Sequence, residues 1–181
     1  MAKVLLPLAE GFEEIEAVTI IDILRRAEVE VVLASLEKKQ VTGAHGIRVQ
    51  AETHIADIKD VEEFDMIVLP GGLPGAFNLQ KDENVQRLLK EFNEKKKYIG
   101  AICAAPIALR EAGVLGEYTC YPSFEENIGK DGYKDDSNVV QDGNITTSKG
   151  PATAMEFAIS LVEKLKSKES AEQLRKDLLL K

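Results

Sequence analysis

The chain has 181 residues, of which 44% are hydrophobic and 30% are charged. This length and composition are typical of one globular domain spanning residues 1–181, and they exclude a disordered chain. The formal charge of −8 disfavours binding to nucleic-acid phosphates, and no apolar run approaches the roughly 20 residues that a membrane helix requires.

The most basic region, residues 162–181, alternates lysines with acids and leucines, which is typical of a solvated helix face. We therefore expect neither nucleic acid nor a membrane as a partner. Cys103 and Cys120 are the two cysteines, too few for a disulfide framework, and no signal peptide is recognisable. These features predict a reducing compartment, and we expect the protein to be cytoplasmic.

Apolar segments bounded by turn residues alternate with helical patterns, which predicts βα units around a mainly parallel sheet. In chain order, we expect a strand at 4–8, a helix at 13–26, a strand at 29–34, small strands or an edge hairpin within 38–58, a strand at 66–70, a helix at 84–96, a strand at 98–102, a helix at 104–112, short strands around 119–120 and at 144–147, and helices at 152–166 and 171–180.

Ligands of open parallel sheets bind beyond the carboxyl ends of the strands. Three segments are expected at that edge: residues 10–16, the turn with Gly71 and Gly72, and Cys103 between a strand and a helix. A thiol at a helix N-terminus lies beside unpaired amides and the positive end of the helix dipole, which favour the thiolate. The amides of Gly72 and Ala104 are the natural donors to an oxyanion on an attacked carbonyl.

Position alone leaves alternatives open. A buried, inert residue is the commonest state of a free cysteine, and position supports this interpretation of Cys103 as well as it supports a nucleophile. Carboxylates at 13, 14 and 16 open the first predicted helix, where capping competes with a role in proton transfer. His45 and His54 have no metal-ligand spacing with a cysteine or with each other, and we expect no metal site. The glycines at 71, 72 and 75 do not form a dinucleotide-binding pattern after the first strand.

Four ordered motifs carry a resemblance to a known family. They are GFEEIE at 11–16, LPGG at 69–72, AICAAP at 101–106 and TSKGP at 147–151. In order and spacing, across nearly the whole chain, they resemble the ThiJ/PfpI superfamily, in its DJ-one-like branch that contains the Parkinson-disease-associated protein deglycase. The resemblance implies a flavodoxin-like three-layer sandwich with a nucleophile elbow, and usually a homodimer.

The same resemblance implies roles for single residues. Cys103 matches the reactive cysteine, and Glu16 matches the protonated glutamate that hydrogen-bonds it. Gly72 and Ala104 match the backbone oxyanion donors, with Gly71 beside them. Members are described as glyoxalases and deglycases acting on methylglyoxal and its early adducts, as redox sensors and chaperones, and in a separate branch as peptidases.

Two departures from the family pattern decide among these activities. Ala104 follows the cysteine where the peptidase-like branch has a histidine, so we do not expect a cysteine peptidase or amidase. Tyr121 occupies a position where the deglycase-like branch often has a histidine, which leaves Glu16 as the leading acid/base. Enclosure near a thiol would raise the pKa of this carboxyl, so that it stays protonated.

We therefore expect a cysteine-dependent, cofactor-independent lyase or hydrolase that acts on a small carbonyl substrate, a 2-oxoaldehyde. The rival hypothesis is a non-enzymatic oxidative-stress sensor or chaperone in which Cys103 is oxidised to sulfinic acid. Cys120 is either a resolving thiol or a buried apolar residue, and the second interpretation is favoured. Tyr121 and Glu14 complete the possible site residues.

Overall fold

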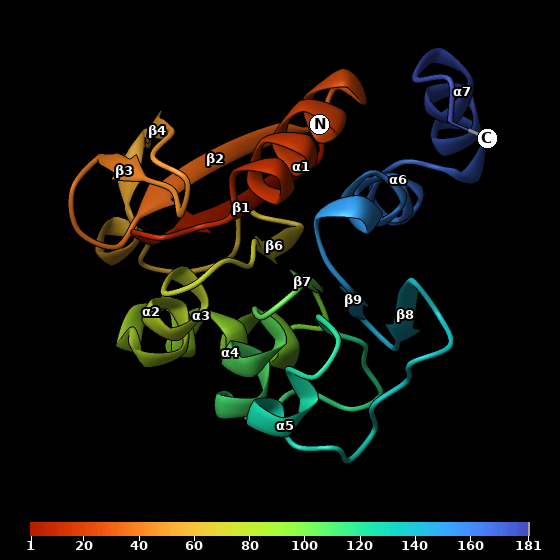
Figure 1. Ribbon diagram of the computed structural model, residues 1–181. Coiled ribbons are helices and arrows are strands. Elements are labelled where there is room, and N and C mark those ends of the chain that lie inside the picture. Colours follow the sequence, from red (N-terminus) through yellow and green to blue (C-terminus); the bar gives the residue numbers. More distant parts are fainter. Residues whose placement is uncertain (181) are drawn as a thin grey trace.

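The computed structural model describes residues 1–180 and has three layers, with a seven-stranded sheet between two layers of helices (Figure 1). The strand order is β5-β2-β1-β6-β7-β9-β8, and every neighbouring pair is parallel except β9 with β8. The strands are β1 (Lys3–Leu8), β2 (Glu30–Ser35), β5 (Thr53–His54), β6 (Met66–Leu69), β7 (Tyr98–Ile102), β8 (Val139–Asp142) and β9 (Ile145–Ser148). This arrangement confirms the predicted three-layer α/β fold with a mainly parallel sheet.

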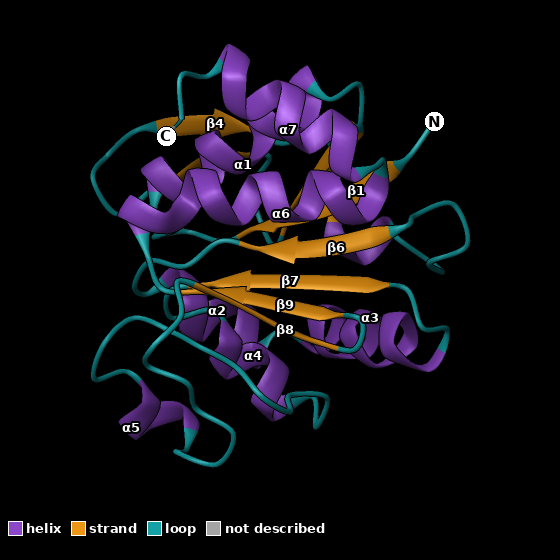
Figure 2. Cartoon of the chain, turned by 90° about the vertical axis from the view of Figure 1, so that its right-hand side faces the viewer, coloured by secondary structure: helices purple, strands orange, loops and turns teal. Residues whose placement is uncertain are grey.

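The helices cover both faces of the sheet. They are α1 (Glu14–Arg26), α2 (Gly75–Lys81), α3 (Glu83–Glu94), α4 (Pro106–Glu111), α5 (Glu125–Ile128), α6 (Ala154–Leu165) and α7 (Lys168–Asp177), with short 3₁₀ helices at Ile55–Asp57 and Pro151–Thr153. Helices α1, α6 and α7 cover one face, and α2, α3 and α4 cover the other (Figure 2). Within residues 1–180, no helix combines the length and the apolar character needed to cross a membrane.

The central strands are apolar because both of their faces are covered. All four residues of β6 are buried, as are five of the six residues of β1. From β1 the chain goes to β2 on one side, whereas β6 pairs with β1 on the other side. The carboxyl ends of β1 and β6 therefore flank a topological switch point, the place where α/β sheets commonly bind ligands.

Helix α1 brings carboxyl groups to this switch point. Its inner face packs against α6 and carries buried Ala17, Ile20 and Leu24. The side chain of Glu13 caps the helix by accepting the N–H of Glu16 at 2.9 Å. The carboxylates of the first turn are nevertheless buried, which apolar packing alone does not explain.

A hairpin of β3 (Gln40–Thr42) and β4 (Arg48–Gln50) stands apart from the main sheet, as two antiparallel strands. Strand β5 follows at the edge of the main sheet. The prediction of small strands or a hairpin within 38–58 is confirmed.

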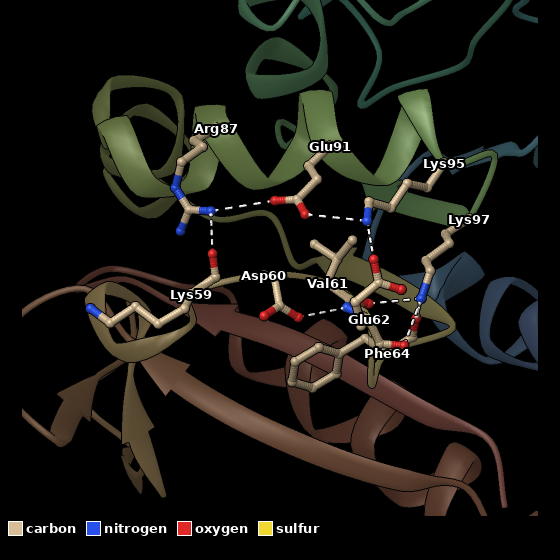
Figure 3. Close-up of polar contacts among 9 residues, drawn as sticks. All are labelled: Lys59, Asp60, Val61, Glu62, Phe64, Arg87, Glu91, Lys95 and Lys97. Atoms are coloured by element: carbon tan, nitrogen blue, oxygen red, sulfur yellow. Dashed lines mark hydrogen bonds and ion pairs between the residues drawn. The ribbon is translucent and has the colours of Figure 1, made fainter.

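A lysine anchors the connection that leads into β6. The Nζ atom of Lys97, just before β7, donates to the backbone oxygens of Val61, Glu62 and Phe64 at 2.7, 2.9 and 2.6 Å (Figure 3). The adjacent Lys95 pairs with the carboxylate of Glu62. These bonds hold the start of β6 beside the start of β7, and so help to set the register that aligns their carboxyl ends.

The predicted strand around 119–120 is wrong. Tyr118 forms only an isolated bridge with Tyr133, and the N–H of Thr119 donates to Oγ1 of Thr147 at 2.9 Å. Because a side chain satisfies this amide, no strand ladder continues through it.

Other boundaries also differ from the prediction. Helix α4 begins at Pro106 rather than at 104, because the preceding turn includes a left-handed residue and proline favours the first helical position. Helices α2 and α5 and strand β8 were not predicted. They are seven, four and four residues long, too short for a clear periodic pattern.

Candidate active site

Cys103 lies in a strained turn between β7 and α4. Its φ angle is 64°, in the left-handed region that residues with side chains rarely adopt. The Cys103 N–H donates to the Ser148 carbonyl at 2.9 Å, and the Cys103 carbonyl accepts the Tyr121 N–H at 3.0 Å. Neighbouring segments thus hold the turn in place, which gives the predicted strand-to-helix elbow.

Glu16 is fully buried on the first turn of α1. Its Oε2 accepts the Gly71 N–H at 2.8 Å, and its Oε1 has no hydrogen-bond partner in the described part of the chain. Burial raises the pKa of Glu16 to about 7, against the hydrogen bonds from Cys103 and Gly71 and with a smaller contribution from the charge of Glu13. This carboxyl can therefore both hold and release a proton near neutral pH.

Gly71 is the point where Cys103 and Glu16 meet. A methyl group on Gly71 would lie 2.5 Å from Cβ of Cys103 and 2.7 Å from Oε2 of Glu16. Gly72 has a φ angle of 92°, and a methyl group there would collide with the backbone of Phe12 and Glu13. Both glycines are needed because the turn after β6 packs directly against the cysteine and the start of α1.

The charge state of Cys103 differs from the expectation. Burial raises the pKa of the Cys103 thiol, and the charge and hydrogen bonding of Glu16 raise it further. The backbone amides of Gly72 and Ala104 act in the opposite direction and lower this pKa. Helix α4 begins only at Pro106, three residues after the cysteine. The raised pKa means that the thiol keeps its proton until a base or an electrophile arrives.

The backbone hydrogen bond from Tyr121 to Cys103 holds Tyr121 next to the site. The side chain is 51% exposed, and its ring lies against Gly150. Residues of the segments 121–122 and 149–153 line an adjoining cavity of about 180 Å³. Tyr121 therefore lies at the edge of the Cys103 turn.

Glu14 is buried, and its carboxylate bonds to the β3–β4 hairpin. It accepts the N–H of His45 at 2.6 Å, the N–H of Ile47 at 3.3 Å and a hydrogen bond from Nδ1 of His45 at 2.9 Å. Burial opposes ionisation, yet the hydrogen bonds from His45 and Ile47 hold the pKa of Glu14 below its usual value. These contacts commit Glu14 to tying the β3–β4 hairpin to α1.

Cys120 is fully buried, and its thiol donates to the Tyr121 carbonyl at 3.4 Å. Burial raises the pKa of Cys120 to about 12, and the charge of Glu125 contributes. The groups that act on Cys120 are not those that act on Cys103. This environment favours the apolar interpretation of Cys120 over a resolving thiol.

Two contributors were missed at the level of sequence. Ser148, within the TSKGP motif, anchors the Cys103 N–H, and the backbone N–H of Glu13 donates to the Gly71 carbonyl at 2.9 Å. Both act through backbone atoms, which residue type does not reveal. Their only sequence signal was membership in the four motifs.

A strained cysteine beside a buried glutamate, at the carboxyl edge of a parallel sheet, defines a class of α/β proteins with a cysteine elbow. The sequence model of the DJ-1/PfpI family matches residues 2–164, and the chain belongs to this family.

Several relatives share this similarity. "Protein DJ-1 homolog B" of Arabidopsis thaliana is 41% identical over 183 residues, which cover 99% of this chain and 42% of that protein. The chain thus spans less than half the length of that relative. "Glutathione-independent glyoxalase DJR-1.2" of Caenorhabditis elegans is 38% identical over 181 residues, covering 99% of this chain and 96% of the relative. The solved structure "Toxoplasma gondii DJ-1, oxidized" is 39% identical, with a TM-score of 0.93 and coverage of 99% and 98%.

Proposed function

We propose that the protein is a cysteine-dependent glyoxalase or deglycase that acts without a dissociable cofactor on 2-oxoaldehydes such as methylglyoxal, free or as early protein adducts. The observation that carries this proposal is the position and the pKa of Glu16. Its carboxyl is fully buried, has a pKa of about 7 and packs against Gly71, the same glycine against which Cys103 packs. A group poised near neutral pH is suited to giving and taking a proton. The name of the nematode relative, a glutathione-independent glyoxalase, supports the same class of reaction.

In the proposed reaction, Sγ of Cys103 attacks the aldehyde carbon and its proton passes to the aldehyde oxygen, which gives a hemithioacetal. Glu16, as the carboxylate, removes the hydrogen from this carbon to form an enediolate. The protonated Glu16 then returns this proton to the neighbouring carbon. The hydroxyl proton of the former aldehyde carbon passes to the neighbouring oxygen, so that the former aldehyde carbon becomes a thioester carbonyl. Water hydrolyses the thioester, which releases the 2-hydroxy acid and restores the thiol. No net oxidation occurs.

The backbone supports the charges that this sequence creates. The amides of Gly72 and Ala104 lower the pKa of the Cys103 thiol, and in the proposed reaction they donate to the oxygen on the attacked carbon. They stabilise the negative charge that develops there before the proton arrives. This support matters because the raised pKa of Cys103 leaves little free thiolate at neutral pH.

The test is steady-state conversion of methylglyoxal to lactate by the full chain, compared with buffer that contains matched amines. We expect Cys103→Ser to abolish turnover and Glu16→Gln to reduce it by roughly 10²–10⁴-fold. Cys120→Ser is the matched control and should keep wild-type turnover. Wild-type protein no faster than the amine control would end the glyoxalase assignment.

A second candidate function is an oxidative-stress sensor, because the Cys103 residue is 9% exposed whereas Cys120 is fully enclosed. One peroxide oxidises Cys103 to sulfenic acid and releases water, and a second takes it to sulfinic acid. The solved relative named as oxidised is consistent with such chemistry in this family. Mass spectrometry after mild peroxide should find two oxygen atoms on Cys103 of a folded chain. Equal oxidation of both cysteines would argue against a sensor.

We also propose a homodimer. Ile15 and Val18 on α1 and Ile47 in the hairpin are large apolar side chains that are exposed on the single chain. The contacts of Glu14 with His45 and Ile47 hold these two elements together. Sedimentation velocity should give a dimer that Val18→Glu dissociates, and a monomeric wild type would refute the proposal.

A further inference from the structure

Three metal-ligating side chains gather beside the active site, on two elements that are distant in sequence. Glu13 and Glu14 open α1, and His45 lies in the turn between β3 and β4. The Nδ1 atom of His45 is 2.9 Å from Oε2 of Glu14 and 3.7 Å from Oε1 of Glu13. One ligand atom from each residue lies within 4.8 Å of the other two.

Glu13 directs an available oxygen into this cluster. Its Oε2 caps α1 through the N–H of Glu16, whereas its Oε1 accepts no hydrogen bond from the residues that the structure describes. The Glu13 side chain is 11% exposed, and Oε1 lies 3.7 Å from Nδ1 of His45. This oxygen is therefore free to bind a cation that the His45 ring also contacts.

The charge around the cluster points the same way. Glu13, Glu14 and Glu16 are all buried, and no lysine or arginine of residues 1–180 forms an ion pair with them. Among the described residues, His45 is the basic group that pairs with Glu13 and Glu14, and it is largely exposed. Buried carboxylates in proteins are generally paired or coordinate a metal. Glu14 already pairs with His45, so Glu13 is the carboxylate whose charge a divalent cation would balance.

We propose that Oε1 of Glu13, Oε2 of Glu14 and Nδ1 of His45 bind a divalent first-row transition ion such as Zn²⁺. Ligand atoms about 2.1 Å from one ion lie about 3–3.5 Å apart, and the two distances from His45 bracket this range. An imidazole ligand favours Zn²⁺ over Mg²⁺ or Ca²⁺. The ion takes the place of the hydrogen between His45 and Glu14. In the single chain the His45 side chain is 72% exposed, which leaves a path from solvent.

Such an ion would fix the hairpin to the start of α1. That segment also holds Gly71, through the backbone N–H of Glu13 and the carboxylate of Glu16. The site is separate from the cysteine, so the proposal does not depend on glyoxalase activity.

The test is binding of Zn²⁺ and Co²⁺ to the metal-stripped full chain. A Cys103→Ser, Cys120→Ser background removes both thiols as competing ligands. Calorimetry should give one Zn²⁺ per chain, and Co²⁺ should produce a visible absorption band without a sulfur charge-transfer component. His45→Ala should weaken Zn²⁺ binding at least about tenfold. The other histidine provides the matched control, and His54→Ala should bind as its parent does.

Stability gives an independent measurement. Zn²⁺ at about 100 times its dissociation constant should raise the melting temperature by about 5–10 °C in the parent and in His54→Ala, and not in His45→Ala. Circular dichroism checks that the exposed His45→Ala variant is folded. The proposal is overturned if the parent binds neither ion, if His45→Ala keeps the parent affinity, or if His54→Ala loses as much affinity as His45→Ala.

Discussion

Gly71→Ala probes the contact between Cys103 and Glu16 without altering either functional group. The added methyl would lie 2.5 Å from Cβ of Cys103, 2.7 Å from Oε2 of Glu16 and 2.9 Å from the Ile102 carbonyl oxygen. Carbon atoms in contact are normally about 3.5–4.0 Å apart, so the cysteine and the glycine turn must separate by about 1 Å.

The cost of this separation has two parts. Overpacking of this kind lowers the free energy of unfolding by about 1–3 kcal/mol, which corresponds to a melting temperature about 3–10 °C lower. A displacement of about 1 Å between reacting groups lowers kcat/KM by about 100-fold. Differential scanning calorimetry and methylglyoxal turnover measure the two effects, and alkylation of Cys103 by iodoacetamide reports the thiol without any substrate.

Gly113→Ala is the matched control. Gly113 has a φ angle of 73°, and no atom lies within 4 Å of an added methyl group. This variant should lose about 1–2 kcal/mol through backbone strain alone while its kcat/KM and thiol reactivity stay unchanged. If Gly71→Ala behaves like Gly113→Ala, with stability reduced but kcat/KM intact, the contact does not position the reactive pair.

Three further predictions concern proton linkage, anchoring and the second cysteine. The folded chain keeps the Glu16 proton up to about pH 7, whereas the unfolded chain loses it near 4.5, so stability should fall by about 3 kcal/mol as pH rises through this window. Urea unfolding measures this free energy, and in Glu16→Gln it should not fall over the same pH range. If the free energy of unfolding of Glu16→Gln falls with pH as in the wild type, the raised pKa of Glu16 is contradicted. Lys97→Met should cost about 2 kcal/mol because three carbonyls lose a charged donor, whereas Lys90→Met on the exposed face of α3 should cost less than about 0.5 kcal/mol. Cys120→Ser should retain iodoacetamide labelling at Cys103, and loss of that labelling would contradict separate thiol environments.

Much of the site follows from local patterns. Apolar strands that end at residues 8, 70 and 102 are recognisable in the sequence, and parallel strands must present their carboxyl ends at one edge. The sequence therefore predicts that the glycines after β6 lie close to the cysteine after β7. Glu16 required the family motif, because capping is the favoured explanation of an acid in the first turn of a helix.

What the sequence did not reveal depends on tertiary packing. The pairing of Glu14 with His45 joins residues on different elements, and neither residue carries a periodic signal of the contact. The predicted lowering of the Cys103 pKa is wrong, because burial raises this pKa by more than the backbone amides of the turn lower it. Residue spacing does not reveal whether a turn residue is buried. The 119–120 strand failed because Thr147 satisfies the Thr119 amide.

The central claim is that Cys103 and Glu16 form one proton-transfer unit. Its most direct test is the pH dependence of kcat/KM for methylglyoxal, in the wild type and in Glu16→Gln. In the wild type, kcat/KM should change with pH around an apparent pKa near 7, and this value belongs to the coupled pair of Cys103 and Glu16. In Glu16→Gln, this pH dependence and most of the rate should be lost. Wild-type turnover by Glu16→Gln across the whole pH range would contradict the claim.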